Sequence, residues 1–124
     1  MYGDIKLLAG TACPELAEEI SAYLSKKCGR PVPLLEREIR KFANDNTFVS
    51  LGESVRGQDV YIIQTIDRPV NDNLMELLIA LDAVRRDSAG RITAVVPYLA
   101  YTRSDKKDQP RTPITARLVA DMIQ

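Results

Sequence analysis

The sequence contains no histidine among its 124 residues. This absence excludes serine–histidine and cysteine–histidine nucleophile pairs, and histidine-ligated metals, from anything that the chain does alone. Cysteine is scarce as well, since Cys13 and Cys28 are too few for a closed structural zinc site. Two thiols fit a reduced cytosolic setting better than a structural disulfide. A metal, if one takes part, is expected to be magnesium that is bound through oxygen and carried in by phosphates.

Long apolar runs and net charge are missing too. No run approaches the roughly 18 residues that span a membrane, and the start of the chain, MYGDIKLLAG, does not read as a secretory signal. The 17 Lys and Arg residues balance 17 Asp and Glu residues, so the chain lacks the broad basic face of a general nucleic-acid binder. We therefore expect a cytoplasmic protein, with neither membrane nor nucleic acid as partner, folded as one domain over residues 1–124.

Apolar patterning alternates between strand and helix along the chain, which indicates an α/β domain. Pro14 suits the first position of a helix, and Gly29 suits its C-cap. Strands are expected at 5–9, 33–42, 47–51, 60–64 and 92–96, with 33–42 near a sheet edge and Asn44, Asp45 and Asn46 as turn residues. A last helix is expected to begin at Pro113 and Thr115 and to run to Gln124.

The clearest unit joins the strands at 60–64 and 92–96. Asn73 and Glu76 have the spacing of a capping box, a helical stripe of leucines follows, and Gly90 is expected to end the helix. A crossover that contains a helix connects parallel strands. The pattern therefore predicts a doubly wound, mostly parallel sheet with flanking helices.

A cationic segment, PYLAYTRSDKKDQPRTPITAR at 97–117, follows the last predicted strand. Ligands of open α/β sheets bind just beyond the carboxyl ends of the strands. Five cations and two anions between 101 and 117 make this segment suitable for a polyanion such as a phosphorylated small molecule. A solvated loop whose charges only confer solubility is the alternative reading.

Three segments together resemble the N-terminal domain of ribose-phosphate pyrophosphokinase, the phosphoribosyl pyrophosphate synthetase family. They are GESVRGQDVYIIQ at 52–64, NDNLMELLIALDAVRR at 71–86 and ITAVVPYLAYTRSDKKDQPRTPITARLVADMI at 92–123. The resemblance implies a phosphoribosyltransferase-like fold with a protruding β-hairpin. It also implies a transferase that moves the diphosphoryl group of Mg·ATP to ribose 5-phosphate and so makes phosphoribosyl pyrophosphate for nucleotide biosynthesis.

The resemblance implies an ATP site built from two segments. Phe42 would stack on the adenine and Asn44 would bond its edge, while Asn46 stands where the family has glutamate. Further ATP-binding residues would be Arg103, which suits phosphate oxygens, Ser104, which stands where the family has glutamine, and Asp108. Lys107 and Arg111 fall where the family has a regulatory site for phosphate or ADP.

Other parts of the family's machinery have no counterpart among these residues. We find neither the acidic-pair loop that holds ribose 5-phosphate nor the metal-site histidine. We therefore expect the first domain of a two-domain enzyme, with no catalytic or metal-binding residue of its own, which reaches ribose 5-phosphate only through an absent C-terminal domain. The resemblance also implies a homo-oligomer whose neighbouring subunits share an ATP site. A non-catalytic regulatory protein that associates with the synthetase stays open as the alternative, because Asn46 and Ser104 depart from the family pattern.

Overall fold

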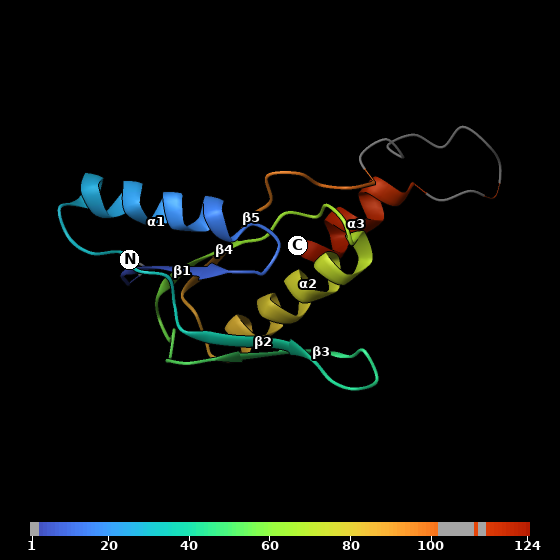
Figure 1. The fold of residues 1–124 in the computed structure, drawn as a ribbon, viewed down its shortest axis with the longest axis horizontal. Coiled ribbons are helices and arrows are strands. Elements are labelled where there is room, and N and C mark those ends of the chain that lie inside the picture. Colours follow the sequence, from blue (N-terminus) through green and yellow to red (C-terminus); the bar gives the residue numbers. More distant parts are fainter. Residues whose placement is uncertain (1–2, 102–110, 112–113) are drawn as a thin grey trace.

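The computed structural model describes residues 3–101, 111 and 114–124. Along the chain it contains β1 (Ile5–Ala9), α1 (Pro14–Cys28), β2 (Arg37–Lys41), β3 (Thr47–Leu51), β4 (Asp59–Ile63), α2 (Val70–Arg86), β5 (Arg91–Val95) and α3 (Thr115–Ile123). In Figure 1, α1 covers one side of the central sheet, α2 covers the other, and the β2–β3 hairpin lies beyond α2. None of the helices in the described ranges is long and apolar enough to cross a membrane.

The central sheet is parallel, with the order β1-β4-β5. β4 is largely buried on both faces, as its continuous apolar run predicts, whereas β5 is only partly buried and its first residue, Arg91, is exposed. Leu7 and Ile63 pack on the α1 side, whereas Leu8 and Ile62 pack on the side of α2 and α3. Successive side chains of a strand point to opposite faces, so these short apolar runs supply two core layers at once. The predicted doubly wound α/β class is confirmed.

A change of direction in the winding occurs between β1 and β4. Leu34 forms a parallel bridge to Leu7, which pairs with Tyr61 of β4 on its other side. The chain after α1 therefore returns along one edge of β1, and the next long crossover leads to the other edge. In doubly wound sheets, the crevice outside the carboxyl ends at such a switch point is where ligands bind.

The hairpin is a separate two-stranded sheet. β2 and β3 pair antiparallel, with Ile39 opposite Val49. Val49 and Leu51 pack against the main core, so the inner face of the hairpin rests on α2. The strand expected at 33–42 near the sheet edge is confirmed there only at Leu34, which bridges β1, and is wrong in extent, because Arg37–Lys41 forms a strand of the hairpin and not of the central sheet.

Both ends of α2 differ from the prediction. The helix starts at Val70, with Pro69 as N-cap and no side-chain capping bond, so Asn73 and Glu76 form no capping box. The reason is that both side chains are used elsewhere, and Asn73 donates to the Asp67 carbonyl at 2.9 Å. At the other end the helix stops at Arg86, before Gly90. By contrast, Gly29 is the predicted C-cap of α1, with a φ of 71°.

Candidate functional site

A polar crevice of about 420 Å³ lies at the switch point. Three segments form its walls: the turn after β1, the start of α2, and the end of the hairpin nearest that helix. Its lining contains Thr11, Ala12, Ile39, Arg40, Lys41, Thr47, Arg68, Pro69, Asp72, Asn73 and Glu76. Cations, carboxylates and hydroxyls thus converge where the fold class places its ligand sites.

The floor of the crevice is a buried hydrogen-bond network around Glu76. This carboxylate is 7% exposed and accepts from the Thr11 amide at 2.8 Å and the Thr11 hydroxyl at 2.7 Å. It also accepts from Nε2 of Gln64, a side chain with no exposed surface, at 2.7 Å. The Gln64 carboxamide oxygen in turn accepts from the Ala12 amide at 3.1 Å. The network therefore fixes the Thr11–Ala12 turn against both β4 and α2, and sequence patterning did not predict it.

An ion pair connects the hairpin to α2 across the crevice. Lys41 Nζ lies 2.8 Å from Asp72 Oδ2. The hydrogen bond that Lys41 donates to Asp72, together with the charge of that carboxylate, raises the pKa of Lys41. At the start of β2, Arg37 Nε donates to the carbonyl of Ala9, the last residue of β1, at 2.9 Å. These two contacts hold the hairpin in position beside the carboxyl ends of the strands.

The hairpin turn exposes the residues predicted to bind adenine. The Phe42 side chain is 43% exposed, and Asn44 and Asn46 are exposed beside it. The Asn44 carboxamide oxygen accepts from the Asn46 backbone amide at 3.2 Å, which holds this side chain against the turn. Asp45 takes a left-handed φ of 67°. The structure thus groups these three predicted residues on one turn.

The second predicted part of the site is described only at its margins. Arg103, Ser104, Lys107 and Asp108 lie outside the described residues, while Arg111 is exposed, with a φ of 61°. Just before this segment, the Tyr101 hydroxyl donates to Asn71 Oδ1. Asn71 is the neighbour of Asp72, which binds Lys41. The start of the cationic segment and the end of β2 therefore approach the same first turn of α2.

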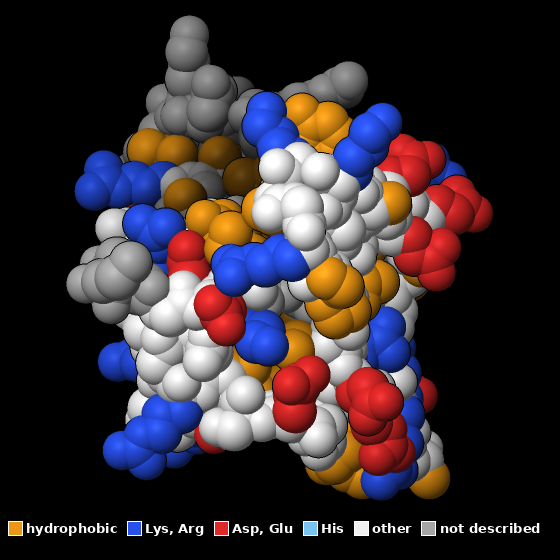
Figure 2. Space-filling view, turned by 90° about the vertical axis from the view of Figure 1, so that its left-hand side faces the viewer, with side chains coloured by type: hydrophobic (Ala, Val, Ile, Leu, Met, Phe, Trp, Pro, Cys, Tyr) orange, Lys and Arg blue, Asp and Glu red, His pale blue; other side chains and the backbone are white. Residues whose placement is uncertain are grey.

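The opposite end of the molecule has a different electrostatic character. There Asp59 and Arg91, directly paired first residues of β4 and β5, form a hydrogen-bonded ion pair at 2.8 Å, and the Arg91 bond lowers the pKa of Asp59. Arg30 lies 3.8 Å from Asp4 nearby. Figure 2, which views the end where the strands begin, shows cationic and anionic side chains intermixed. This end offers no single-sign surface to an anionic ligand.

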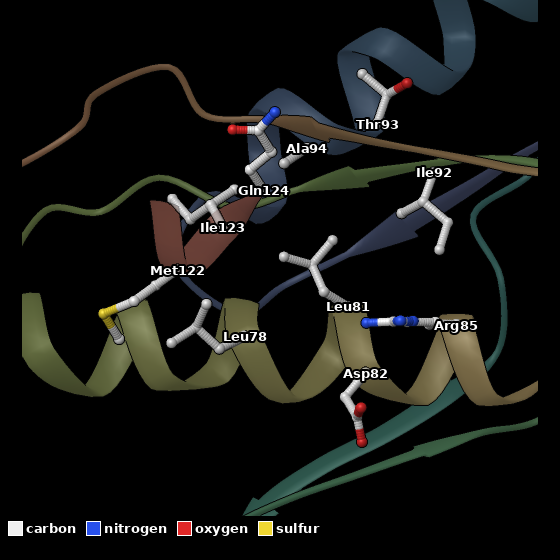
Figure 3. Close-up of a pocket in the computed structure, with 10 residues that line it drawn as sticks. All are labelled: Leu78, Leu81, Asp82, Arg85, Ile92, Thr93, Ala94, Met122, Ile123 and Gln124. Atoms are coloured by element: carbon white, nitrogen blue, oxygen red, sulfur yellow. The ribbon is translucent and has the colours of Figure 1, made fainter. Parts of the chain in front are cut away.

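A larger cavity of about 730 Å³ runs between α2, β5 and the end of α3. Figure 3 shows Leu78 and Leu81 pointing from α2 into the space next to Ile92 and Ile123. Asp82 and Arg85 contribute charge along α2. Because apolar side chains dominate and the cavity lies away from the switch point, it does not fit a polyphosphate, and the crevice stays the candidate site.

Comparison with known structures defines the class of the fold first. A purine phosphoribosyltransferase from Pyrococcus horikoshii superimposes with a TM-score of 0.51 at 13% identity, covering 80% of this chain and 65% of that chain. At this identity the likeness concerns the fold alone, which is phosphoribosyltransferase-like. A phosphoribosylpyrophosphate synthetase from Mycobacterium smegmatis superimposes with a TM-score of 0.89 at 45% identity, covering 97% of this chain and 38% of that chain.

The sequence comparisons specify the family. The family model for the N-terminal domain of ribose phosphate pyrophosphokinase matches residues 5–124, and the chain belongs to this family. Ribose-phosphate pyrophosphokinases of Rhizobium meliloti and Campylobacter jejuni are 52% and 50% identical over 119 residues, or 96% of this chain. The chain spans 36% and 37% of the length of these two relatives. The predicted resemblance is confirmed.

Proposed function

We propose that this chain is the ATP-side domain of a ribose-phosphate diphosphokinase that transfers diphosphate from Mg·ATP to ribose 5-phosphate. The observation that carries the proposal is the exposed Phe42–Asn46 turn next to a switch-point crevice, in a chain whose family match covers residues 5–124. Ribose 5-phosphate would be held by another domain of the parent protein.

The proposed roles follow from side-chain chemistry. Phe42 stacks on adenine and the Asn44 amino group bonds its edge, with Asn46 as a further contact. Arg103 binds phosphate oxygens through its fixed guanidinium fork, with Ser104 and Asp108 beside it. Lys107 and Arg111 belong to a separate regulatory site for phosphate or ADP.

Magnesium would arrive with the nucleotide in this proposal. Within residues 3–101, 111 and 114–124, no three His, Cys, Asp or Glu side chains come together to hold a metal ion. Magnesium retains several waters and often binds through substrate phosphates rather than in an all-protein cage. The donor set of the described residues therefore fits Mg·ATP better than a resident ion. The bound ion would offset charge on the transferred diphosphate.

Replacement of Arg103 tests the phosphate role. A charged hydrogen bond is typically worth about 1.5–3 kcal/mol, so Arg103→Ala should weaken Mg·ATP binding roughly ten-fold or more. Isothermal titration of the purified chain at low and high salt measures this, and the wild-type affinity should fall with salt. Arg30→Ala, at the opposite end of the molecule, is the matched control and should bind like wild type. Identical titrations for Arg103→Ala and wild type would remove Arg103 from the site.

The second candidate function is a non-catalytic protein that associates with the synthetase. It is favoured by Asn46 and Ser104, which replace a family carboxylate and a family amide at the nucleotide site. Expression of the complete parent reading frame, followed by an assay for phosphoribosyl pyrophosphate formation, separates the two functions. Product formation supports the enzyme, and nucleotide-independent binding to an active synthetase supports the associated protein.

Self-association is part of the proposal. The inner face of the hairpin packs on α2, so its outer face, with the partly exposed Phe42 and Phe48, is the part available to another subunit. We expect at least a dimer, with residues 43–50 in or near the contact, so that neighbouring subunits share an ATP site. Light scattering from micromolar to hundred-micromolar concentration should give a mass above the monomer. A monomeric mass over that whole range contradicts the shared site for this chain.

A further inference from the structure

Three side chains form a cluster on the outer face of the hairpin. The Arg40 guanidinium carbon lies 5.0 Å from the centre of the Phe42 ring and 4.7 Å from the centre of the Phe48 ring. The two rings meet edge to face, with centres 5.4 Å apart and planes at 63°. A guanidinium at this distance is attracted to the negative face of an aromatic ring, so each member of the cluster contacts the other two.

Strand register creates this arrangement. Arg40 and Phe48 are direct cross-strand partners, and Phe42 follows Arg40 by two positions, so all three project from the same face of the pleat. Glu38, two positions before Arg40, accepts from Arg40 Nε at 2.7 Å. The guanidinium is thus fixed from one side by a carboxylate and from the other by two rings.

The contacts within the cluster reduce the conformational entropy that the Phe42 side chain would lose on binding a ligand. Phe42 is the first residue after β2 and is 43% exposed, so a ring without neighbours would lose rotamer freedom on binding a ligand. Contacts with Arg40 and Phe48 restrict the ring before any ligand arrives. Restricting a group in its bound conformation improves affinity because the ordering cost is met in the free protein.

We propose that Arg40 and Phe48 are positioning residues that orient the Phe42 ring as a stacking platform for the purine base of the nucleotide. The inference rests on the proposed function and adds two residues to the base-binding half of the site. We assign Arg40 to the ring and not to the phosphates on the basis of its contacts with Glu38 and both phenyl groups. The platform recognises the flat face of a base, and the triphosphate depends on other residues.

Paired titrations with Mg·ATP and with magnesium tripolyphosphate, which has no base, test this assignment. Arg40→Met keeps the aliphatic length and removes the planar charge, and Phe48→Leu removes the second ring. Each should weaken Mg·ATP about three- to five-fold, the range of an exposed cation–π contact, and leave tripolyphosphate binding unchanged. Phe42→Leu should have a larger effect on Mg·ATP, about ten-fold, because it removes the platform itself. Arg40→Lys should recover only part of the loss, since an ammonium is not planar.

Arg30→Met, which removes an exposed arginine at the other end of the molecule, should leave both titrations unchanged. Equal weakening of Mg·ATP and tripolyphosphate by Arg40→Met would make Arg40 a phosphate ligand and overturn the inference. Unchanged Mg·ATP affinity in Arg40→Met and Phe48→Leu, with a loss in Phe42→Leu, would also overturn it while leaving the ATP site intact. Absence of Mg·ATP binding by the wild-type chain would instead refute the proposed function, and the inference with it.

Discussion

Replacing Glu76 with alanine should lower the free energy of unfolding by about 3 kcal/mol or more. The carboxylate accepts three hydrogen bonds from Thr11 and Gln64, and bonds to a charged group contribute about 1.5–3 kcal/mol each when taken singly. The three share one acceptor group, so their contributions do not add fully. Without the carboxylate, Gln64 Nε2 retains only the Asn73 carbonyl, at 3.4 Å. Urea denaturation followed by far-ultraviolet circular dichroism measures the change.

Two further variants make the Glu76 experiment specific. Glu76→Gln should be tolerated much better. The carbonyl oxygen of the new side chain can accept from the Thr11 backbone amide and from Gln64 Nε2, while its amino group donates to the Thr11 hydroxyl. Glu18→Ala removes an exposed glutamate of α1 and should change stability by no more than about 0.5 kcal/mol. If Glu76→Ala and Glu76→Gln unfolded at the same urea concentration, hydrogen bonding by this side chain would contribute nothing to stability.

The same network connects folding to the site. Thr11 and Ala12 line the crevice, and their amides are held by Glu76 and Gln64 respectively. A turn that follows a strand is otherwise the part of an α/β unit most free to move. Fixing it from the buried side leaves the outer surface of the turn with one defined shape, which is what a ligand site requires.

Strand positions were predictable because they depend on local patterning. The predicted 5–9 and 47–51 segments coincide with β1 and β3. The strands β4 (Asp59–Ile63) and β5 (Arg91–Val95) both start and end one residue earlier than predicted. Their first residues, Asp59 and Arg91, are cross-strand partners joined by an ion pair, so charge extends the ladder beyond the apolar run. A pairing between residues 32 positions apart leaves no signal in either local segment.

The ends of α2 were not predictable for a related reason. Capping-box spacing at Asn73 and Glu76 is a local signal, but tertiary partners in the turn after β1 and in the loop before the helix use both side chains instead. A better signal was available, because Asn73 and Glu76 lie in phase with the buried stripe of Leu77, Ala80 and Val84. Polar residues on a buried stripe need partners inside the protein. Gln64, at the end of an apolar strand, was the matching partner.

The adenine-binding role of the hairpin turn was predictable only through family resemblance, and none of the residues that line the crevice was among the predicted site residues. Nothing in the local pattern distinguishes Phe42 from an ordinary apolar anchor of a turn, and the structure brings it together with Asn44 and Asn46 as an exposed group. The contacts with Arg40 and Phe48 follow from hairpin register, which becomes known only when the turn length is fixed. The roles of Arg103, Ser104, Lys107 and Asp108 stay predictions, since these residues lie outside the described ranges.

Gly10→Ala should destabilise the fold by about 2 kcal/mol, within the range of overpacked buried sites. Gly10 is buried and continues the β1 ladder through a bond from its amide to the Ile63 carbonyl at 2.9 Å. A Cβ at this position would overlap the Gln64 carboxamide and lie 2.9 Å from Glu76 Oε2. Gln64 has no exposed surface and is fixed by Glu76 and Ala12, so it cannot turn aside without breaking those bonds. Urea denaturation measures the loss.

A double-mutant cycle separates this cause from a general intolerance of alanine at Gly10. If the added methyl group acts by displacing Gln64 from its network, Gly10→Ala should cost much less in the Glu76→Ala background, where the network is already broken and the carboxylate volume is vacant. The coupling between neighbouring sites of this kind is typically about 0.5–3 kcal/mol. Strict additivity of the two substitutions would mean that Gly10→Ala destabilises the protein through the backbone at position 10 and not through displacement of Gln64. Sub-additive losses would mean that Gly10, Gln64 and Glu76 stabilise the crevice floor as one unit.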